Sequence, residues 1–410
     1  MNILIVTQYF WPENFKINDF ALGLSKRGHK ITVLTGFPNY PEGKLFEGYS
    51  MRKSSRYVEK YKHVTVMRSF LLPRGAGSGF RLLINYISFA ISASVRILKL
   101  KDNFDLIFVY EPSPITVCIP AIILKKRKKT PIIMWVTDLW PESIRAASKI
   151  NNGIIEKLLN PLVTFIYHSC NSIFVTSKGF ISSIVDRKIG IDKIHYFPQW
   201  AEPIFKPIFT TKPIISEIPN NSFKIIFAGN IGEAQDFPSI LKAAQLLKNN
   251  INIHWIIIGS GRKENWLKDQ LALKNLENNF HMAGRYDLKK MPKIYSTADA
   301  MLLSLRDEHI FSLTIPAKLQ SYMACGKPIL GMVNGEVAKI IEEANAGLTC
   351  SSGDFEGLVK NVLKMSTFSD RELKKLSDNS INFYEANFNR GMLFKRAEYL
   401  FYQTIKSFRN

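Results

Sequence analysis

Three short turns in the second half of the chain carry the residue types that bind phosphate groups. Two of them, 229–232 (Gly-Asn-Ile-Gly) and 259–261 (Gly-Ser-Gly), follow apolar segments. The third, 314–318, places Pro316 where a helix would begin and ends on Lys318. Free backbone N–H groups and the helix dipole at strand-to-helix turns attract anions, and proline suits the first helical turn. A glycine turn is also a common structural feature, so these are candidate phosphate sites that need further support.

Several other kinds of chemistry are disfavoured by what the sequence lacks. It has neither the G-x-G-x-x-G fingerprint of dinucleotide enzymes nor the P-loop motif. Its four cysteines form no C-x-x-C pair, which argues against a zinc site or a disulfide framework and favours a reducing compartment. Asp138 and Glu142 are spaced like two carboxylates on one helix face, but Pro141 interrupts a helix there. A hydrolytic carboxylate pair is therefore not expected.

Short apolar segments alternate with helical segments along most of the chain. This alternation predicts parallel sheets that are covered by helices on both faces. A stretch with five prolines between 197 and 222 interrupts the rhythm and is interpreted as a linker. We therefore expect an α/β protein with two facing, doubly wound, Rossmann-like lobes and a cleft at the carboxyl ends of their strands. The predicted parts are a basic first lobe (1–200), a linker (201–222), a second lobe (223–377) and a helical segment that packs back towards the first lobe (378–410).

The net positive charge is concentrated in the first half, because acidic residues are fewer there. Residues 1–200 carry 28 of the 55 lysines and arginines but only 13 of the 34 acidic residues. Such an excess points to a polyanionic partner. Nucleic acid is not expected, because no helix-turn-helix, RNP or zinc-finger pattern is present. An anionic membrane surface or a phosphorylated acceptor remains. The amino terminus begins directly with a strand-like segment rather than a signal peptide, which predicts a cytoplasmic location.

One segment, 80–98, is apolar and long enough to span a membrane. It contains Arg81, Asn85 and Arg96, which a spanning helix would tolerate poorly. Two interpretations remain open: a helix that lies in the membrane interface with its basic residues near headgroups, and an ordinary buried helix. The basic run 125–129 is likewise either a lipid-facing patch or a solvated loop.

A family resemblance rests on stretches along the whole length. They are PEN at 12–14 with 24–29, WVTDLWPE at 135–142, FAGNIG at 227–232, IIGSG at 257–261, STAD at 296–299, and IPAK at 315–318 running into YMACGKP at 322–328. With these the chain resembles the retaining glycosyltransferases of family 4, which have the GT-B fold. Within that family it is similar to O-antigen and capsule enzymes that transfer N-acetyl-L-fucosamine or a related amino sugar to a lipid-linked acceptor.

The resemblance implies roles for particular residues. Asp138 would contact the donor sugar, the loop 10–16 and the turn 229–232 would face the donor diphosphate, and the loop 284–286 would hold the nucleobase. The residues that it assigns to donor binding are Glu13, Asn14, Lys16, Asn230, Gly232, Gln235, Arg262, Arg285, Tyr286, Ile315, Pro316, Ala317, Gln320 and Ser321.

The chain also departs from the family pattern. The family's two basic residues fall on Asn230 and Gln235, and its two glutamates fall on Leu313 and Ser321. A leaving diphosphate must still be neutralised. No Asp-x-Asp motif is present to hold a metal, so no metal or other cofactor is expected. The expected substitutes are Lys318, helped by Arg262 and Lys16, with Glu308 in place of the sugar-binding acid.

The expected activity is a retaining transfer from a UDP-sugar to a polyprenyl-diphosphate-linked saccharide, in O-antigen, capsule or lipopolysaccharide biosynthesis. It would take place on the inner face of a bacterial plasma membrane. Two alternatives remain: a UDP-sugar 2-epimerase, which shares the two-lobed architecture, and a non-catalytic scaffold that is related to the transferases.

Overall fold

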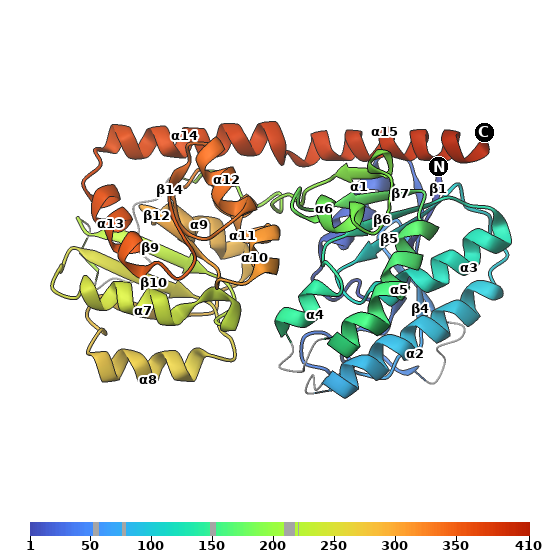
Figure 1. Cartoon of the computed structure of the whole chain (residues 1–410), viewed down its shortest axis with the longest axis horizontal. Helices are drawn as coiled ribbons and strands as arrows, with labels where there is room; N and C mark the ends of the chain where they lie inside the picture. The colour runs from blue at the N-terminus through green and yellow to red at the C-terminus, as the bar shows by residue number, and fades with distance from the viewer. Residues whose placement is uncertain (52–56, 76–78, 148–152, 209–217, 220) are drawn as a thin grey trace. The chain divides into compact units, whose positions relative to one another are not determined.

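Uninterrupted apolar segments form the central strands of two β-sheets in the computed structural model (Figure 1). A strand that is covered on both faces is expected to be apolar along nearly all of its length. Accordingly, β5 (Leu106–Glu111) and β6 (Ile132–Val136) are buried at every residue. The structure describes the chain except residues 52–56, 76–78, 148–152, 209–217 and 220. The prediction of two doubly wound α/β lobes is confirmed.

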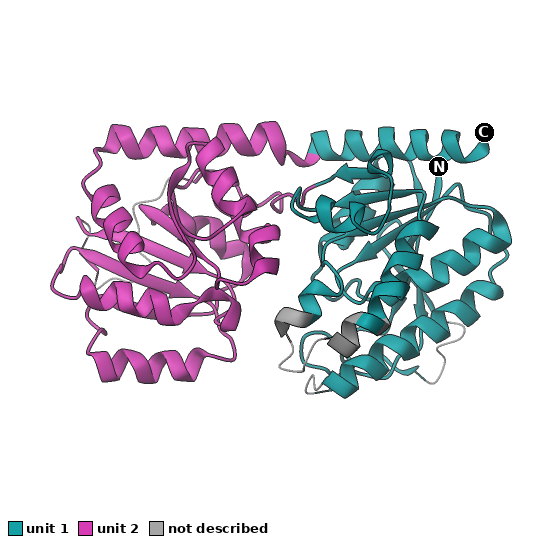
Figure 2. Ribbon diagram, in the orientation of Figure 1, with its two compact units in different colours: residues 1–197, 391–410 teal, residues 198–390 magenta. Residues whose placement is uncertain are grey.

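The chain separates into two compact units (Figure 2). Unit 1 contains residues 1–197 and 391–410, and unit 2 contains residues 198–390. The described part of the segment 201–222, which was predicted as a linker, belongs to unit 2. The segment 378–410 is divided between the units rather than belonging to one of them.

Unit 1 has an eight-stranded sheet in the order β3-β4-β2-β1-β5-β6-β7-β8. Neighbouring strands are parallel except for the antiparallel pair β3 and β4. Its other strands are β1 (Asn2–Val6), β2 (Lys30–Gly36), β3 (Val58–Tyr61), β4 (Val64–Ser69), β7 (Ser172–Val175) and β8 (Ile194–Tyr196). Its helices are α1 (Lys16–Lys26), α2 (Gly79–Leu98), α3 (Ile119–Lys128), α4 (Glu142–Ala147), α5 (Gly153–Ser169), α6 (Phe180–Val185) and α15 (Arg390–Arg409).

The last helix of the chain completes the core of unit 1. The Phe394 ring on α15 lies 5.1 Å from that of Phe20 on α1, and the Phe401 ring lies 5.6 Å from that of Phe108 on β5. On the same helix, Glu398 accepts a hydrogen bond from Arg27 Nε at 2.8 Å. The apolar face of α15 therefore covers one side of the sheet, while α2, α3 and α5 pack together on the other (Figure 1).

Unit 2 has a six-stranded, fully parallel sheet in the order β11-β10-β9-β12-β13-β14. Its strands are β9 (Phe223–Ala228), β10 (Ile253–Ile258), β11 (Phe280–Gly284), β12 (Ala300–Ser304), β13 (Ile329–Met332) and β14 (Gly347–Cys350). Its helices are α7 (Phe237–Leu246), α8 (Glu264–Lys274), α9 (Met291–Ser296), α10 (His309–Leu313), α11 (Ala317–Ala324), α12 (Glu336–Glu343), α13 (Phe355–Ser366) and α14 (Asp370–Asn387).

The strand orders identify where each unit can bind a ligand. The direction of winding reverses between β1 and β5 in unit 1 and between β9 and β12 in unit 2. Open α/β sheets bind ligands at the carboxyl ends of the strands at such reversal points. The carboxyl edges of the two sheets are therefore the candidate sites, one in each unit.

Helix α2 exposes one apolar face to solvent. Six large apolar side chains on it are each between 44% and 71% exposed: Phe80, Leu83, Ile87, Ile91, Val95 and Leu98. Among the described helices, α2 is long and apolar enough to cross a membrane, on grounds of length and composition alone. Two of its polar residues point into the unit instead: Asn85 donates to the carbonyl of Leu72 at 2.6 Å, and Arg96 donates to the carbonyl of Tyr57 at 2.9 Å.

Some of the basic residues that were predicted to face lipid have partners within the protein. In the run 125–129, Lys125 donates to the carbonyl of Ser169 at 2.7 Å, and Arg127 donates to that of Ile97 at 3.0 Å. Lys128 donates to the carbonyl of Lys101 at 3.1 Å. Positive side chains at helix ends satisfy carbonyls that the helix leaves free. Arg96, Lys125, Arg127 and Lys128 therefore have structural roles within unit 1, and the membrane contact of this region stays a prediction.

Candidate functional site at the carboxyl edges of the two sheets

The two glycine turns of unit 2 pack directly against each other. A Cβ atom on Gly259 would lie 1.8 Å from the carbonyl oxygen of Gly229, and one on Gly261 would lie 2.2 Å from that of Ile231. Gly259 also has a φ of +144°, and Gly229 has a φ of +148°, where side chains are rarely tolerated. The turns are joined by a hydrogen bond from the Ile231 N–H to the Ser260 carbonyl at 3.0 Å. The glycines are thus required for a close backbone approach.

Lys318 lies beside this pair of turns. Its Nζ atom would be 3.3 Å from a Cβ on Gly229 and lies 4.1 Å from the centre of the Phe227 ring. The Nζ atom is shielded from solvent and has no hydrogen-bond partner among the described residues. Burial lowers the pKa of Lys318 to about 7. A buried amine without a partner is costly, so this position is suited to an incoming anion.

Helix α11 begins at the same edge. Ile315 and Pro316 lead into it, Ala317 and Lys318 form its first turn, and no side chain caps its amino end. The Tyr322 hydroxyl donates to the Ala228 carbonyl at 3.1 Å and fixes the helix to β9.

Two predicted donor residues on α11 point away from a ligand role. Gln320 is buried and, with its amide oriented to satisfy its neighbours, donates to the carbonyls of Pro316 and Ala317 at 3.1 Å. Ser321 is buried too and donates to the Ala317 carbonyl at 3.4 Å. Both side chains are used within the helix start.

The loop after β9 brings further predicted residues together. A Cβ on Gly232 would lie 2.5 Å from Asn230 Nδ2 and 3.3 Å from Gln235 Oε1. The loop is held to the end of β12 by a hydrogen bond from the Ser304 hydroxyl to the Gln235 carbonyl at 2.7 Å. Asn230, Gly232 and Gln235 therefore form one cluster at the reversal point of unit 2.

The remaining predicted residues of unit 2 are more exposed. Arg262 and Arg285 are exposed, and Tyr286 lines a pocket of about 470 Å³ with residues of α8 and β11. Glu308 precedes α10 and forms an ion pair with Arg306 at 2.9 Å, with both side chains 41% exposed. Exposed pairs of this kind contribute little to stability, so Glu308 is free to exchange its partner.

In unit 1, Glu13 fixes loops rather than presenting its carboxylate. It is buried and accepts hydrogen bonds from the backbone N–H groups of Asn39 and Tyr40, each at 2.8 Å, and of Phe10 at 3.2 Å. Burial raises its pKa to about 7, and these hydrogen bonds act in the opposite direction. Glu13 therefore joins the loop after β1 to the loop after β2.

The neighbours of Glu13 differ in exposure. Asn14 is exposed, and Lys16 is a buried residue at the start of α1. The expected contact of these two residues with a donor diphosphate stays a prediction.

Asp138 lies in the loop after β6, next to a buried acid that the sequence patterns did not reveal. Burial raises the pKa of Asp138 to about 6, and the polar groups of Ser143, Ser113 and Trp140 beside it act in the opposite direction. Glu111 ends β5 and is fully buried; burial, and then the charge of Asp138, raise its pKa well above the usual range. Two adjacent acids in a low-dielectric setting do not both ionise readily, so the pair can hold a proton.

Ser113 connects this pair to its surroundings. Its backbone N–H donates to Glu111 Oε1 at 3.0 Å, and its hydroxyl accepts from Trp140 Nε1 at 3.1 Å. Ser113 has a φ of +89°, an uncommon conformation for a non-glycine residue. Such strain is frequent at functional sites. Glu111 and Ser113 were missed because β5 and β6 meet only in the folded sheet.

Aromatic rings line the same edge of unit 1. Tyr9 stacks on Phe15 with ring centres 5.0 Å apart, and Tyr40 lies 5.2 Å from Phe15. The guanidinium of Arg74 lies over the Tyr40 ring at 4.9 Å. The edge thus has apolar walls, a cation and a carboxylate, a combination that suits sugars and their phosphates.

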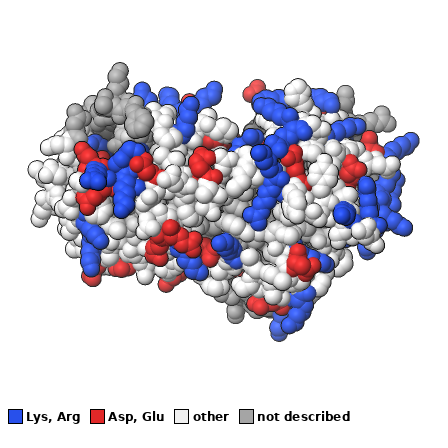
Figure 3. Space-filling view, turned by 90° about the horizontal axis from the view of Figure 1, so that it is seen from above, with Lys and Arg blue, Asp and Glu red and all other residues white. Residues whose placement is uncertain are grey.

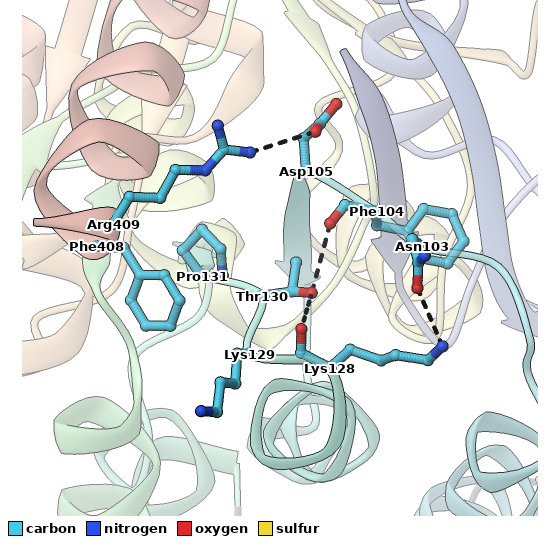
Figure 4. Close-up of a pocket in the computed structure, with 9 residues that line it drawn as sticks. All are labelled: Asn103, Phe104, Asp105, Lys128, Lys129, Thr130, Pro131, Phe408 and Arg409. Atoms are coloured by element: carbon cyan, nitrogen blue, oxygen red, sulfur yellow. Dashed lines mark hydrogen bonds and ion pairs between the residues drawn. The ribbon is translucent and has the colours of Figure 1, made fainter.

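A pocket elsewhere in unit 1 is not part of this edge (Figure 4). It has a volume of about 530 Å³ and lies next to the amino ends of β5 and β6. Two of its charged residues, Arg409 and Asp105, form an ion pair at 3.7 Å. A third, Lys128, donates a hydrogen bond to Asn103 Oδ1 at 3.0 Å.

The charges on the surface are mixed. In the view of Figure 3, lysine and arginine side chains form several groups with acidic side chains between them. Within the described residues, no group of three His, Cys, Asp or Glu side chains is arranged to hold a metal ion.

Comparison with known proteins shows similarity to glycosyl transferases, both in a family model and in a curated relative. Residues 209–382 match the family model described as "Glycosyl transferases group 1". The chain is 22% identical over 340 residues to an Escherichia coli (strain K12) protein named "Putative colanic acid biosynthesis glycosyl transferase WcaI", covering 80% of this chain and 82% of that protein.

Two solved structures show the same fold. Sucrose-phosphate synthase (tll1590) from Thermosynechococcus elongatus superimposes with a TM-score of 0.76 at 13% identity, covering 99% of both chains. Anabaena Alr3699/HepE, solved in complex with UDP and glucose, gives 0.67 at 14% identity, covering 98% of this chain and 99% of that one. These likenesses extend to both units and identify the fold as GT-B.

Proposed function

We propose that this chain, a glycosyltransferase with the GT-B fold whose residues 209–382 match the group 1 glycosyl transferases, transfers an amino sugar from a UDP-sugar to a polyprenyl-diphosphate-linked saccharide. N-acetyl-L-fucosamine is the proposed donor sugar, and the product belongs to bacterial O-antigen, capsule or lipopolysaccharide biosynthesis. The relative named for colanic acid biosynthesis supports a role in polysaccharide assembly. UDP in the HepE structure supports the proposed donor.

The observation that carries the proposal is the unpartnered Nζ of Lys318 at the edge of unit 2. It lies beside Gly229 and in the first turn of a helix whose amino end has no side-chain cap. A cation and free N–H groups in this arrangement bind a diphosphate. Lys318 thereby replaces the family's basic pair, which is missing at Asn230 and Gln235.

The transfer itself needs few groups from the protein. The bond between the sugar C1 and the β-phosphate oxygen breaks, and the acceptor hydroxyl oxygen bonds to C1 on the same face, so the configuration is retained. The hydroxyl proton passes to the departing phosphate oxygen. Lys318 and the N–H groups of α11 stabilise the charge that develops on that phosphate, which is where catalysis of this kind acts most strongly. No metal is proposed to take part.

Asp138 is proposed to act from unit 1. Its pKa of about 6 leaves it ionised near neutral pH. A carboxylate in that state accepts hydrogen bonds from sugar hydroxyls and favours the positive charge that develops on the sugar ring in the transition state.

The proposed location is the inner face of the plasma membrane, to which the protein attaches peripherally. The support is the exposed apolar face of α2, together with the positive charge of residues 1–200. An apolar helix face in a basic surrounding is typical of proteins that lie on an anionic bilayer.

Calorimetry with UDP, GDP and ADP, with and without EDTA, tests the proposal. We expect UDP alone to bind tightly, and EDTA to leave its dissociation constant unchanged. Selective binding of GDP or ADP would refute the UDP-sugar donor, and a loss of affinity in EDTA would refute the metal-independent mechanism. Failure to bind any nucleotide would favour the scaffold alternative, which the missing basic and acidic family residues at Asn230, Gln235, Leu313 and Ser321 also suggest.

A further inference from the structure

Arg74 lies at the carboxyl edge of unit 1 without an ionic partner. Among the described residues, its guanidinium forms no hydrogen bond or ion pair, and it lies over the Tyr40 ring, 4.9 Å from the ring centre. An arginine held over an aromatic ring keeps its N–H groups available in a planar fork, which matches the oxygens of a phosphate group. The side chain is therefore placed for an anionic ligand.

The backbone at Arg74 is fixed, directly and indirectly, by two neighbouring loops. The Arg74 N–H donates to Asn39 Oδ1 at 3.1 Å, and the Asn39 N–H donates to the buried carboxylate of Glu13 at 2.8 Å. The next residue, Gly75, donates to the Gly43 carbonyl at 3.0 Å, and a Cβ on Gly43 would lie 1.8 Å from the Gly75 carbonyl oxygen. The loop after β4 is thus joined to the loops after β1 and β2, and the position of Arg74 is determined by the fold.

Tyr86 on α2 lies close to the residues around Asp138, because its ring is 6.3 Å from that of Trp140. Burial raises the pKa of Tyr86, Arg74 opposes this increase, and Asp138 adds to it, so both charges act on the same hydroxyl. Arg74 also opposes the increase that burial causes at Tyr9. A ligand at this edge would therefore meet both a cation and a carboxylate, together with tyrosine rings.

The exposed face of α2 begins close to Arg74 in the chain. The first of its six exposed apolar residues is Phe80, which is 71% exposed. If this face lies on a bilayer, Arg74 lies near the level of the headgroups, where the diphosphate of a lipid-linked acceptor would be found.

We propose that Arg74 binds the diphosphate of the lipid-linked acceptor, and that the acceptor saccharide extends from Arg74 along Tyr40 and Tyr86 towards Asp138. This rests on the proposed function, because it assigns the acceptor half of that reaction to named residues. It also gives a role to both charges that act on Tyr86: Arg74 would hold the acceptor diphosphate, and Asp138 would lie near the reacting hydroxyl.

The test measures binding of farnesyl diphosphate to the full-length protein with UDP at saturating concentration, so that the donor site is occupied. We expect Arg74→Gln to weaken this binding at least tenfold, Arg74→Lys to restore part of it, and the dissociation constant of UDP to stay within twofold of wild type. Neutral farnesol should bind equally to all variants.

Arg81→Gln is the matched control. Arg81 is an exposed residue on the first turn of α2, and its guanidinium lies near Gly75, so the substitution removes the same charge from the same region. It should change farnesyl diphosphate binding less than twofold. Binding to vesicles with phosphatidylglycerol should be the same for the two glutamine variants. Each variant loses one positive charge from the same region, and general attraction to anionic headgroups depends on that charge rather than on a specific diphosphate site.

Three results would overturn the assignment of Arg74. They are equal losses in Arg74→Gln and Arg81→Gln, no binding of farnesyl diphosphate to the UDP-saturated wild type, and a weaker affinity of Arg74→Gln for UDP. Failure of the proposed function looks different: the wild-type protein would then not bind UDP at all.

Discussion

The carboxyl edges of the two units differ in the chemical groups that form them. In unit 2 the edge consists mainly of backbone: two glycine turns in contact, the amino end of α11, and the single buried amine of Lys318. In unit 1 it consists of side chains, with the aromatic rings around Tyr40, the cation of Arg74 and the acid pair of Asp138 and Glu111. Backbone N–H groups suit a diphosphate, which is common to every nucleotide donor, whereas side chains can be varied to suit a particular acceptor.

The largest effect is expected from Gly259→Ala. The new Cβ would lie 1.8 Å from the Gly229 carbonyl oxygen, at a φ of +144°, so the two turns must separate. We expect a loss of more than about 3 kcal/mol in the free energy of unfolding and no measurable UDP binding.

Gly353→Ala is the control for backbone conformation. Gly353 belongs to the same unit and has a φ of +80°, but a Cβ there would meet nothing within 4 Å. It should cost only about 1 kcal/mol and leave UDP binding unchanged. If denaturant titrations give the same loss of unfolding free energy for both alanine variants, the close contact between the two turns is not the reason that glycine is needed at position 259.

Lys318→Met should reduce kcat by about a hundredfold or more, because one charge that stabilises the leaving diphosphate is lost. The fold should not suffer. The folded pKa of Lys318, about 7, lies below the value of an unfolded lysine, so burial of the amine destabilises the protein most at pH 7 and below, and this cost diminishes as the pH rises towards about 10.

Thermal unfolding at two pH values tests the predicted pH dependence of the stability cost of burying Lys318. Lys318→Met should raise Tm relative to wild type at pH 6 and by less at pH 9. A lower Tm at pH 6 would mean that the amine has a stabilising partner in the folded protein, and an unchanged kcat would remove Lys318 from the mechanism.

Asp138→Asn should decrease kcat moderately, by about tenfold, because the side chain keeps its shape but loses the negative charge that favours the transition state. With a pKa of about 6, wild-type activity should fall as the pH decreases through 6 and the carboxylate is protonated. The pH–rate profile of the variant should lack this acidic limb. An unchanged profile would mean that Asp138 contributes only to the structure of unit 1.

The smallest effect concerns the outer face of α2. Ile91 is 60% exposed, so Ile91→Ser should not affect folding but should weaken binding to anionic vesicles about threefold. Ile251 in unit 2 is 75% exposed and serves as the control, since Ile251→Ser should leave vesicle binding unchanged. Equal behaviour of the two variants in a sedimentation assay would contradict a membrane role for α2.

The edge of unit 2 could be predicted from the sequence because its features are local. A glycine turn after an apolar strand, or a proline followed by a lysine at a helix start, can be recognised within a few residues. The positions of the turns 229–232 and 259–261 and of Lys318 were predicted in this way. That the two turns touch could not be predicted, because it depends on the pairing of β9 with β10.

The edge of unit 1 was less predictable, because it is formed by loops that are far apart in the chain. Glu111 and Asp138 lie at the ends of two strands, β5 and β6, that are neighbours only in the folded sheet. Arg74 follows β4, and the sequence does not reveal that β4 pairs with β2. Glu13 shows the converse: the resemblance suggested donor binding, but its carboxylate is used by three backbone N–H groups.

The central claim is that the buried amine of Lys318 meets the donor diphosphate, and proton-linked calorimetry tests it most directly. UDP is titrated at pH 8 into wild type and Lys318→Met, in two buffers with different ionisation enthalpies. Because burial lowers the pKa of Lys318 to about 7, most of the amine is neutral at pH 8 and must be protonated when the diphosphate binds. The account predicts uptake of nearly one proton per UDP by wild type and none by the variant. Equal proton uptake by the two proteins, or none by either, would contradict it.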